Sequence, residues 1–162
     1  MAKEKTPVTP AIRQLRSAGA RFTEHLYQYE ERGGTSVSAR ELGVDEHAVI
    51  KTLIMEDERK NPLVVLMHGD RQVSTKELAR IIGVKQIAPC APETASRHSG
   101  YLVGGTSPFG LRKPMPVYME ETILVLPRIY LNGGKRGFLV GVAPDEVVRL
   151  LQPFLVRVGI EG

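Results

Sequence analysis

The chain has 162 residues, 42% of them hydrophobic and 25% charged, which provides for a buried core and excludes an intrinsically disordered protein. Lys and Arg outnumber Asp and Glu by 22 to 18, and this mild basic excess permits an anionic partner such as RNA without establishing one. The single cysteine, Cys90, excludes an internal disulfide and a multi-cysteine metal site, and it fits a reducing, cytoplasmic compartment. No apolar run has the length of a signal-peptide core or a membrane span, so we expect no membrane association.

Signals for helices and strands alternate in the first half of the chain. Helices are expected where a capping residue or a proline opens an amphipathic run and a glycine closes it, as Ser74, Glu77 and Gly83 do around one capping box. Strands are expected for short apolar or alternating runs. In chain order the sequence predicts a helix over residues 10–18, a strand over 21–30, a short helix over 38–42, a further turn capped by Asp45, strands over 48–55 and 61–68, a helix over 74–82 and a strand over 84–88.

The second half of the chain is richer in strand signals. In chain order it predicts a helix over residues 92–99, strands over 101–105, 116–120, 128–132 and 138–142, a helix over 144–152 and a terminal strand over 154–160. The order is irregular and lacks the strict βαβ repeat of a doubly wound fold. We therefore expect one α/β (α+β) domain over residues 1–162, with a central mixed β-sheet flanked by helices.

One cation, Lys51, interrupts the apolar run over residues 48–55. A buried ammonium group is costly unless it is paired. One interpretation is an edge residue whose aliphatic stem packs while its ammonium reaches water. The other is a cation at the wall of a pocket, where it holds a phosphate or stabilises a developing negative charge. The local pattern leaves both interpretations open.

Residues 100–110 form a glycine-rich segment, GYLVGGTSPFG. Glycines let backbone N–H groups approach a ligand closely, so this segment can form an anion nest or an oxyanion hole. It matches neither a phosphate-binding P-loop nor a dinucleotide-binding fingerprint. An ordinary glycine-rich turn is the alternative, and the segment alone does not decide between the two.

A second glycine-rich stretch, NGGKRG, spans residues 132–137. Gly133 and Gly134 can form a tight hairpin turn that leaves Lys135 and Arg136 exposed at its tip. This basic pair then either contacts a phosphate group or is solvated and binds nothing.

The histidines and the cysteine offer little for catalysis. The histidines at positions 25, 47, 68 and 98 lack the helical spacing of a zinc motif, so we predict no metal site and no cofactor. Cys90 lies between prolines, without a base and an orienting group near it in the sequence. We therefore expect a packed residue there and not a nucleophile.

Five stretches, taken in order, resemble one family. They are TPA at residues 9–11, F..H.Y at 22–27, VIKTLI at 49–54, SGYLVGGTSPFG at 99–110 and IYLNGGKRG at 129–137. Together they resemble the YbaK-type aminoacyl-tRNA deacylases, which are free-standing relatives of the editing domain of bacterial prolyl-tRNA synthetase. The resemblance runs from about Thr9 to the last predicted helix. Each stretch is short, and their combination and order make the match specific.

The resemblance implies a central mixed sheet, flanked by helices, around one pocket. It places the functional lysine of the family on Lys51 and a tyrosine of the pocket wall on Tyr27. The loop whose backbone amides face the substrate carbonyl falls on Gly104, Gly105, Thr106, Ser107 and Pro108. Further substrate contacts fall on Gly133, Gly134, Lys135 and Arg136. YbaK-type members often carry an acidic residue where this chain has Leu139, and this departure leaves the amino-acid specificity open.

The activity implied by the resemblance is trans-editing, the hydrolysis of the ester between a wrong amino acid and the 3′ end of a tRNA. Cys-tRNA(Pro) is the implied substrate and Ala-tRNA(Pro) the alternative. A non-catalytic module that binds tRNA or a synthetase on the same fold is the alternative of a different class. The implied partners are aminoacyl-tRNA and prolyl-tRNA synthetase, with no metal. The sequence does not decide whether water, the vicinal hydroxyl of the tRNA or the substrate thiol is the nucleophile.

Overall fold

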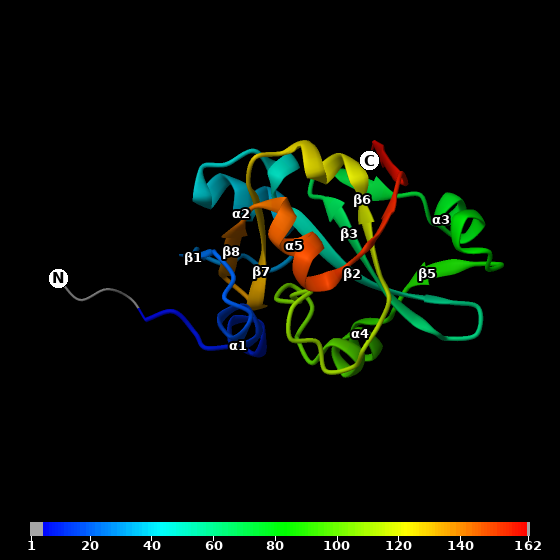
Figure 1. Cartoon of the computed structure of the whole chain (residues 1–162), viewed down its shortest axis with the longest axis horizontal. Coiled ribbons are helices and arrows are strands. Elements are labelled where there is room, and N and C mark those ends of the chain that lie inside the picture. The colour runs from blue at the N-terminus through cyan, green and yellow to red at the C-terminus, as the bar shows by residue number, and fades with distance from the viewer. Residues whose placement is uncertain (1–4, 162) are drawn as a thin grey trace.

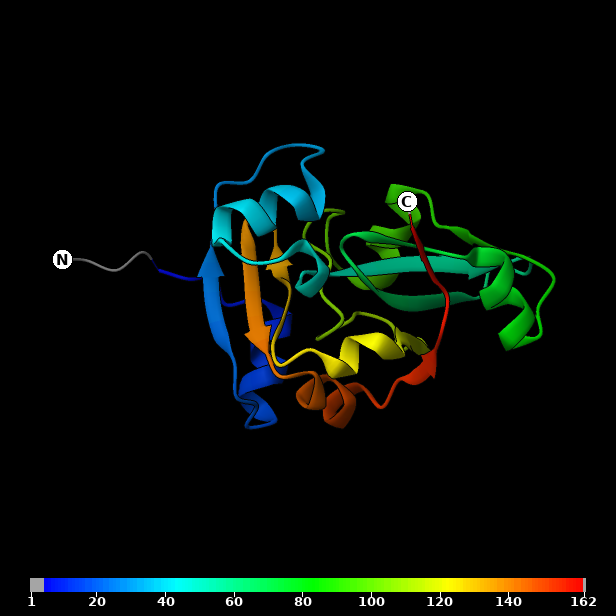
Figure 2. The ribbon, with the colours of Figure 1, turned by 90° about the horizontal axis from the view of Figure 1, so that it is seen from above.

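The computed structural model describes residues 5–161, and its strands form two main sheets that meet at a seam (Figures 1 and 2). The strands are β1 (Thr23–Leu26), β2 (Ile50–Asp57), β3 (Pro62–His68), β4 (Arg71–Val73), β5 (Ile87–Pro89), β6 (Val117–Glu120), β7 (Ile129–Lys135), β8 (Phe138–Val142), β9 (Phe154–Val156) and β10 (Gly159–Glu161). The larger sheet has the strand order β5-β2-β3-β6-β9, the smaller has β1-β8-β7, and β10 pairs with β4.

The larger sheet is mixed, as the sequence predicts. β2 is antiparallel to both β3 and β5, whereas β3, β6 and β9 run parallel to one another. Side chains on both faces of β3 are buried, with Val64 and Leu66 on one face and Val65 and Met67 on the other. β3 is therefore the covered central strand that its continuous apolar run indicates.

The smaller sheet consists of the antiparallel hairpin β7–β8, with β1 paired to the other side of β8. In Figure 2 its strands run across the direction of β2 and β3. The main core lies between the two sheets and includes residues of both, together with residues of the first, fourth and fifth α-helices. A second cluster lies on the other face of the larger sheet, and a third, small cluster forms around Val49 and Leu139.

The predicted hairpin turn at Gly133 and Gly134 is wrong. Both glycines lie within β7, where a bulge between Asn132 and Lys135 absorbs them. Gly134 has a φ of 100°, a conformation that glycine adopts without strain. The chain turns after Lys135, through Arg136 and the next residue, because Lys135 already pairs with the first residue of β8.

The helices begin and end largely where their caps predict. They are α1 (Pro10–Ser17), α2 (Gly34–Leu42), α3 (Thr75–Ile82), α4 (Pro92–Ser99) and α5 (Pro144–Leu151), with short 3-10 turns η1 (Glu46–Ala48) and η2 (Glu121–Val125). The side chains of Thr9, Asp45 and Ser74 each accept a hydrogen bond from a backbone N–H of the turn that they precede. The hydroxyl of Thr9 also donates to the carbonyl of Gly133, which ties α1 to the bulge of β7.

Several predicted boundaries differ from the structure, and the strand predicted over residues 21–30 is confined to β1, so Tyr27 lies just beyond that strand. α2 begins at Gly34 and not at residue 38, and it has no side-chain cap that could have marked its start. Residues 101–105 form no strand, because local bonds, such as that from the amide of Gly105 to the carbonyl of Leu102, hold this segment as a turn. Residues 154–160 form β9 and the start of β10, which pair with different partners.

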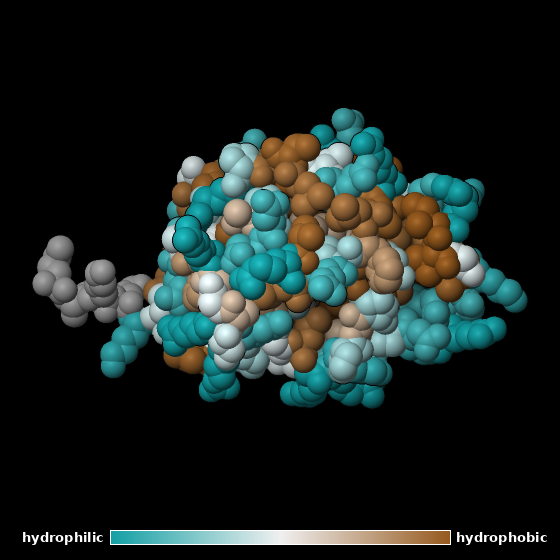
Figure 3. All heavy atoms as spheres, in the orientation of Figure 1, coloured by the Kyte–Doolittle hydropathy of each residue, from teal (hydrophilic) through white to brown (hydrophobic). Residues whose placement is uncertain are grey.

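Part of the exposed apolar surface lies over the C-terminal strands and α3. Figure 3 shows hydrophobic residues on the half of this face that carries the C-terminal strands and α3. Exposed large hydrophobic residues on these elements are Ile81, Phe154, Leu155 and Ile160. Among residues 5–161, no helix combines the length and the apolar character that crossing a membrane requires.

Candidate active site

A cavity of about 640 Å³ opens at the seam between the two sheets. An isolated parallel bridge joins Val49 to Tyr130, and residues that follow it on both strands line the cavity. The rest of the wall comes from the segment after β1, from α2, from the segment between β5 and α4, and from the glycine-rich loop that follows α4. The volume lies in the range typical of small-molecule sites.

Lys51 brings an ammonium group to the wall of this cavity. Its Nζ donates a hydrogen bond to the backbone carbonyl of Arg71, the first residue of β4. Partial burial lowers the pKa of Lys51, and the carboxylates of Glu46 and Asp70 oppose this effect. The carbonyl uses one N–H of the ammonium, so further donors remain for a ligand in the cavity. Lys51 is thus a half-buried cation at a pocket wall.

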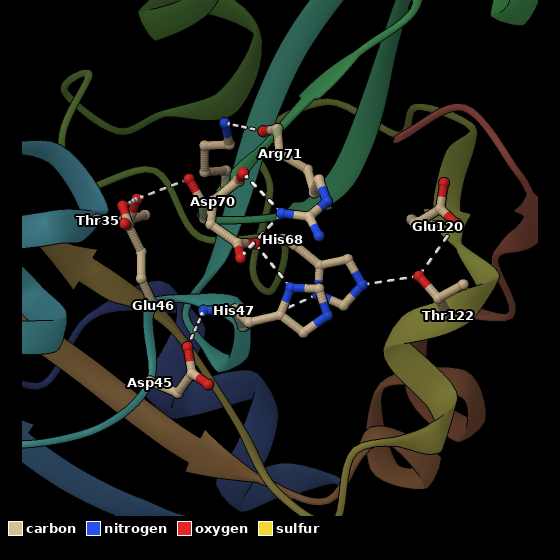
Figure 4. A network of polar contacts seen from close by, with 11 residues as sticks. Thr35, Asp45, Glu46, His47, His68, Asp70, Arg71, Glu120 and Thr122 are labelled. Atoms are coloured by element: carbon tan, nitrogen blue, oxygen red, sulfur yellow. Dashed lines mark hydrogen bonds and ion pairs between the residues drawn. The ribbon is translucent and has the colours of Figure 1, made fainter. Parts of the chain in front are cut away.

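A network of polar side chains fixes the carbonyl that holds Lys51 (Figure 4). The imidazole rings of His47 and His68 stack, with their centroids 3.6 Å apart. Asp70 accepts a hydrogen bond of 2.7 Å from Nδ1 of His47, and its carboxylate forms an ion pair with Arg71 over 3.1 Å. Because Asp70 is held from both sides, the backbone of Arg71 presents its carbonyl to Lys51 in a defined position.

His68 is a neutral, buried member of this network. Its Nδ1 donates to the carbonyl oxygen of His47 over 2.7 Å, since a carbonyl can only accept. Its Nε2 lies 2.7 Å from the hydroxyl of Thr122, which in turn lies 3.1 Å from a carboxylate oxygen of Glu120. Burial lowers the pKa of His68 below its ordinary value, which favours the neutral imidazole at neutral pH.

His47, His68 and Asp70 form a cluster that we did not predict from the sequence. The side-chain atoms of these residues that could bind a metal lie within 4.8 Å of one another. The geometry does not suit a metal ion. A metal binds an imidazole nitrogen in the plane of the ring, whereas these two rings are stacked with an angle of only 7° between them. Both nitrogens of His68 are already hydrogen-bonded. The cluster is better explained as a hydrogen-bonded support for β4.

We expect the protein to lose stability as the pH falls from about 7 to about 5. A histidine with a lowered pKa binds more protons unfolded than folded, so its contribution to stability is present above the unfolded pKa and is lost below it. His68→Gln should make the free energy of unfolding less dependent on pH in this window. Urea unfolding at several pH values measures this. His98→Gln, which removes a less buried imidazole whose pKa is also lowered, should have a smaller effect. An unchanged pH dependence in His68→Gln would contradict the assignment.

The glycine-rich loop reaches the cavity with only part of its length. Gly104 and Thr106 line the cavity. Gly105, Ser107 and Pro108 are buried and lie outside its lining. Ser107 supports the loop from within, because its hydroxyl accepts a hydrogen bond of 3.2 Å from the amide two residues later. The structure thus brings two of the five predicted loop residues to the cavity.

Gly105 connects the loop to the β7–β8 hairpin. A Cβ atom on Gly105 would lie 2.8 Å from the backbone nitrogen of Arg136, so only glycine permits this close approach. The amide of Gly105 donates to the carbonyl of Leu102 over 2.9 Å, so it is already engaged. The amides of Gly104 and Thr106 are therefore the candidate donors of this loop to a carbonyl oxygen in the cavity.

Of the residues predicted to contact the substrate, some line the cavity and others lie outside it. Tyr27 and Arg136 line the cavity, whereas Lys135 is exposed at the hairpin tip beside it. Gly133 and Gly134 do not line the cavity, and a Cβ atom on either would collide with a neighbouring aromatic ring. These two glycines therefore serve the packing of the bulged strand.

Cys90 and Leu139 also lie in the cavity wall. Burial raises the pKa of the Cys90 thiol to about 11, and the carboxylate of Glu56, 3.7 Å from the sulfur, adds to this effect. The thiol is protonated at neutral pH and is a poor nucleophile, as expected for a packed residue. Leu139 is buried and supplies no carboxylate to the cavity.

Two cavity-lining residues that sequence reasoning missed carry buried polar atoms for which residues 5–161 supply no hydrogen-bond partner. They are Thr52, through Oγ1, and Asn132, through Oδ1. A buried polar atom left unpaired costs about 1–3 kcal/mol. The signal available in the sequence was the second polar residue in the apolar run over residues 48–55.

We expect Thr52→Val to raise the free energy of unfolding by about 1 kcal/mol, because it replaces an unpaired buried hydroxyl with a methyl group of similar shape. Thr35→Val is the matched control with the opposite sign, since the Thr35 hydroxyl is bonded to Glu46 over 2.7 Å. Urea denaturation of the two variants compares them directly. A loss of stability in Thr52→Val would show that its hydroxyl is paired.

Comparisons with known proteins agree with this fold and cavity. The family model described as the aminoacyl-tRNA editing domain matches residues 30–150. A relative from Enterococcus faecalis with the printed name "Putative Cys-tRNA(Pro)/Cys-tRNA(Cys) deacylase EbsC" is 29% identical over 152 residues, which cover 93% of each chain. Proline–tRNA ligase of Thermodesulfovibrio yellowstonii is 33% identical over 148 residues, but these cover 89% of the present chain and only 23% of the ligase.

A solved structure shares the fold over nearly the whole chain. It is described as that of a "putative trans-editing enzyme for prolyl tRNA synthetase", with a TM-score of 0.84 and 20% identity, and the match covers 96% of this chain and 99% of the other. At 20% identity this likeness shows the fold alone. The family model covers residues 30–150, which include most of the cavity-lining residues. The chain therefore belongs to the aminoacyl-tRNA editing domain family.

Proposed function

We propose that the cavity at the seam is the active site of a trans-editing hydrolase that cleaves the ester of mischarged aminoacyl-tRNA. The observation that carries the proposal is the ammonium of Lys51, which lies with unused donors on the wall of the cavity that the glycine-rich loop also lines. The volume of about 640 Å³ accommodates an amino acid joined to a nucleoside. Family membership supports the same class of substrate.

The proposed roles follow from the position of each residue. Lys51 holds the terminal phosphate or another polar group of the substrate. The amides of Gly104 and Thr106 donate to the carbonyl oxygen as negative charge develops on it. Tyr27 forms part of the wall around the amino acid, and Lys135 contacts the tRNA backbone. The buried residues Gly105, Ser107, Pro108 and Gly133, together with the partly buried Gly134, keep these groups in place.

The chemistry requires little of the protein. An aminoacyl ester is already reactive. A single preorganised donor to the oxyanion lowers the activation free energy by about 2.7–4 kcal/mol. Water, the vicinal hydroxyl of the tRNA or a thiol on the substrate can be the nucleophile. Cys90, with its raised pKa, takes no part in this proposal.

Cys-tRNA(Pro) is the substrate that we favour, and Ala-tRNA(Pro) is the second. The printed name of the Enterococcus faecalis relative supports the first of these. The proposed partner is prolyl-tRNA synthetase, because the chain is similar to a segment of bacterial proline–tRNA ligases. We propose that residues 1–162 act as one such deacylase domain.

A second candidate function is a non-catalytic module that binds tRNA or a synthetase. Leu139 is the observation that favours it, since this buried wall residue occupies the position at which related deacylases often carry an acid. Lys51 and the loop amides favour the enzyme, because a module that only binds tRNA has no need of donors inside a cavity.

Lys51→Met tests the enzyme directly. It should lower the single-turnover rate of Cys-tRNA(Pro) deacylation by about 100-fold or more, since misplacing a reacting ester by about 1 Å has an effect of that size. The melting temperature should stay the same or rise, because the ammonium is partly desolvated in the folded protein. Lys51→Arg should rescue poorly, as a planar fork does not replace a compact ammonium.

Lys76→Met, which removes an exposed lysine of α3, is the control for that experiment and should keep the parental rate. A folded Lys51→Met protein that hydrolyses the substrate at the parental rate would remove Lys51 from the mechanism.

Lys135→Gln should weaken tRNA binding and flatten its salt dependence. Each lost contact to a single-stranded phosphate reduces the slope of log affinity against log salt concentration by roughly 0.7. Lys135→Gln should affect tRNA binding without altering the cavity, because the Lys135 side chain is exposed at the hairpin tip and does not line the cavity. Filter binding at several salt concentrations gives the slope, with Lys85→Gln as an exposed control. An unchanged slope would leave Lys135 as a solvated residue.

A further inference from the structure

The rim of the cavity carries an arginine whose guanidinium lies over a tyrosine ring. The guanidinium carbon of Arg136 lies 5.4 Å from the centroid of the Tyr29 ring, and both residues line the cavity. Nε of Arg136 donates to the carbonyl of Val103 over 2.9 Å, which holds the guanidinium in place. Arg136 is nevertheless exposed and lines the cavity, so its side chain is accessible to a ligand.

Apolar side chains are exposed beside this pair. Leu102 is 65% exposed and Val103 is 45% exposed, although both are large hydrophobic residues. Val103 lines the cavity together with Gly104. A Cβ atom on Gly104 would lie 2.8 Å from the hydroxyl of Tyr29, so the tyrosine packs directly against the loop. The rim thus offers a flat cationic group bordered by apolar side chains.

The charges around the rim are mixed, and this argues against a site that binds by charge alone. Glu30 and Glu31 line the cavity beside Arg32 and Arg136. Glu30 is paired with Arg40 on α2 over 2.8 Å. A phosphate gains little from such a rim, whereas an uncharged aromatic ring gains from stacking on the guanidinium and from the apolar neighbours.

We propose that Tyr29, Arg136 and Val103 form a stacking platform for the terminal base of the acceptor strand. This rests on the proposed function: an ester held inside the cavity is joined to a ribose, and the base on that same ribose must then lie at the rim. Unpaired bases of RNA stack on aromatic rings and on arginine planes. The outer face of Arg136 receives the base, and Tyr29 supports the guanidinium from behind.

The test compares two acceptor-stem RNA minihelices, each carrying cysteine through a stable 3′-amide in place of the ester. One ends in adenosine and the other in an abasic ribose. The wild-type protein should bind the first roughly 10-fold more tightly, a typical contribution of one stacked base. Tyr29→Leu and Arg136→Lys should reduce this ratio toward one, whereas Tyr29→Phe should keep it. Arg136→Lys is informative, because lysine retains the charge but lacks the plane.

The chain offers a matched control in Arg128, whose guanidinium carbon lies 5.7 Å from the Tyr130 ring and which does not line the cavity. Arg128→Lys should leave the ratio unchanged. A displaced loop weakens both minihelices alike, so the ratio separates stacking from a structural effect. Equal binding of the two minihelices by the wild-type protein, or a full ratio in Tyr29→Leu and Arg136→Lys, would overturn the platform alone. Failure of the wild-type protein to bind either one would overturn the proposed function with it.

Discussion

The site depends on the way β2 and β7 separate. An isolated bridge joins Tyr130 of β7 to Val49, the residue just before β2, and the two strands diverge after it. The two sheets share a core, and residues that follow the bridge on both strands also line a cavity of about 640 Å³. Every group of interest is positioned relative to this seam. β2 carries Lys51 directly after the bridge, and the hairpin that continues from β7 carries Arg136 to the rim.

The polar groups that line this cavity lower the free energy of unfolding. Thr52 and Asn132 keep buried polar atoms unpaired, and Lys51 keeps a partly desolvated ammonium. These groups cost free energy in the folded protein, and functional sites retain local conflicts of this kind. The surrounding structure compensates. The polar network of His47, Asp70 and Arg71 and the close packing of Gly105 on the hairpin hold the cavity walls from outside. A hydrolytic second site has a use in translation, because a synthetase pocket separates similar small side chains by only about 10–200-fold.

Much of the fold could be predicted from the sequence, since the helix caps at Thr9, Asp45 and Ser74 and the apolar run of β3 are local patterns. Lys51 stood out because it breaks such a pattern. The stacked histidines could not be predicted, because β2 and β3 bring His47 and His68 together through pairing across 21 positions of the chain. The turn at Gly133 and Gly134 was wrong because a bulge depends on packing against Phe138 and Tyr101, which no local pattern encodes.

An editing site in this cavity should hydrolyse mischarged tRNA and spare the correctly charged one. The most direct measurement is single-turnover deacylation by the wild-type protein of Cys-tRNA(Pro), Ala-tRNA(Pro) and Pro-tRNA(Pro), each against spontaneous hydrolysis without protein. We predict that Cys-tRNA(Pro) is hydrolysed fastest, Ala-tRNA(Pro) more slowly and Pro-tRNA(Pro) at the spontaneous rate. Spontaneous rates for both mischarged substrates, with the protein folded and bound to tRNA, would contradict the account and favour a module that only binds.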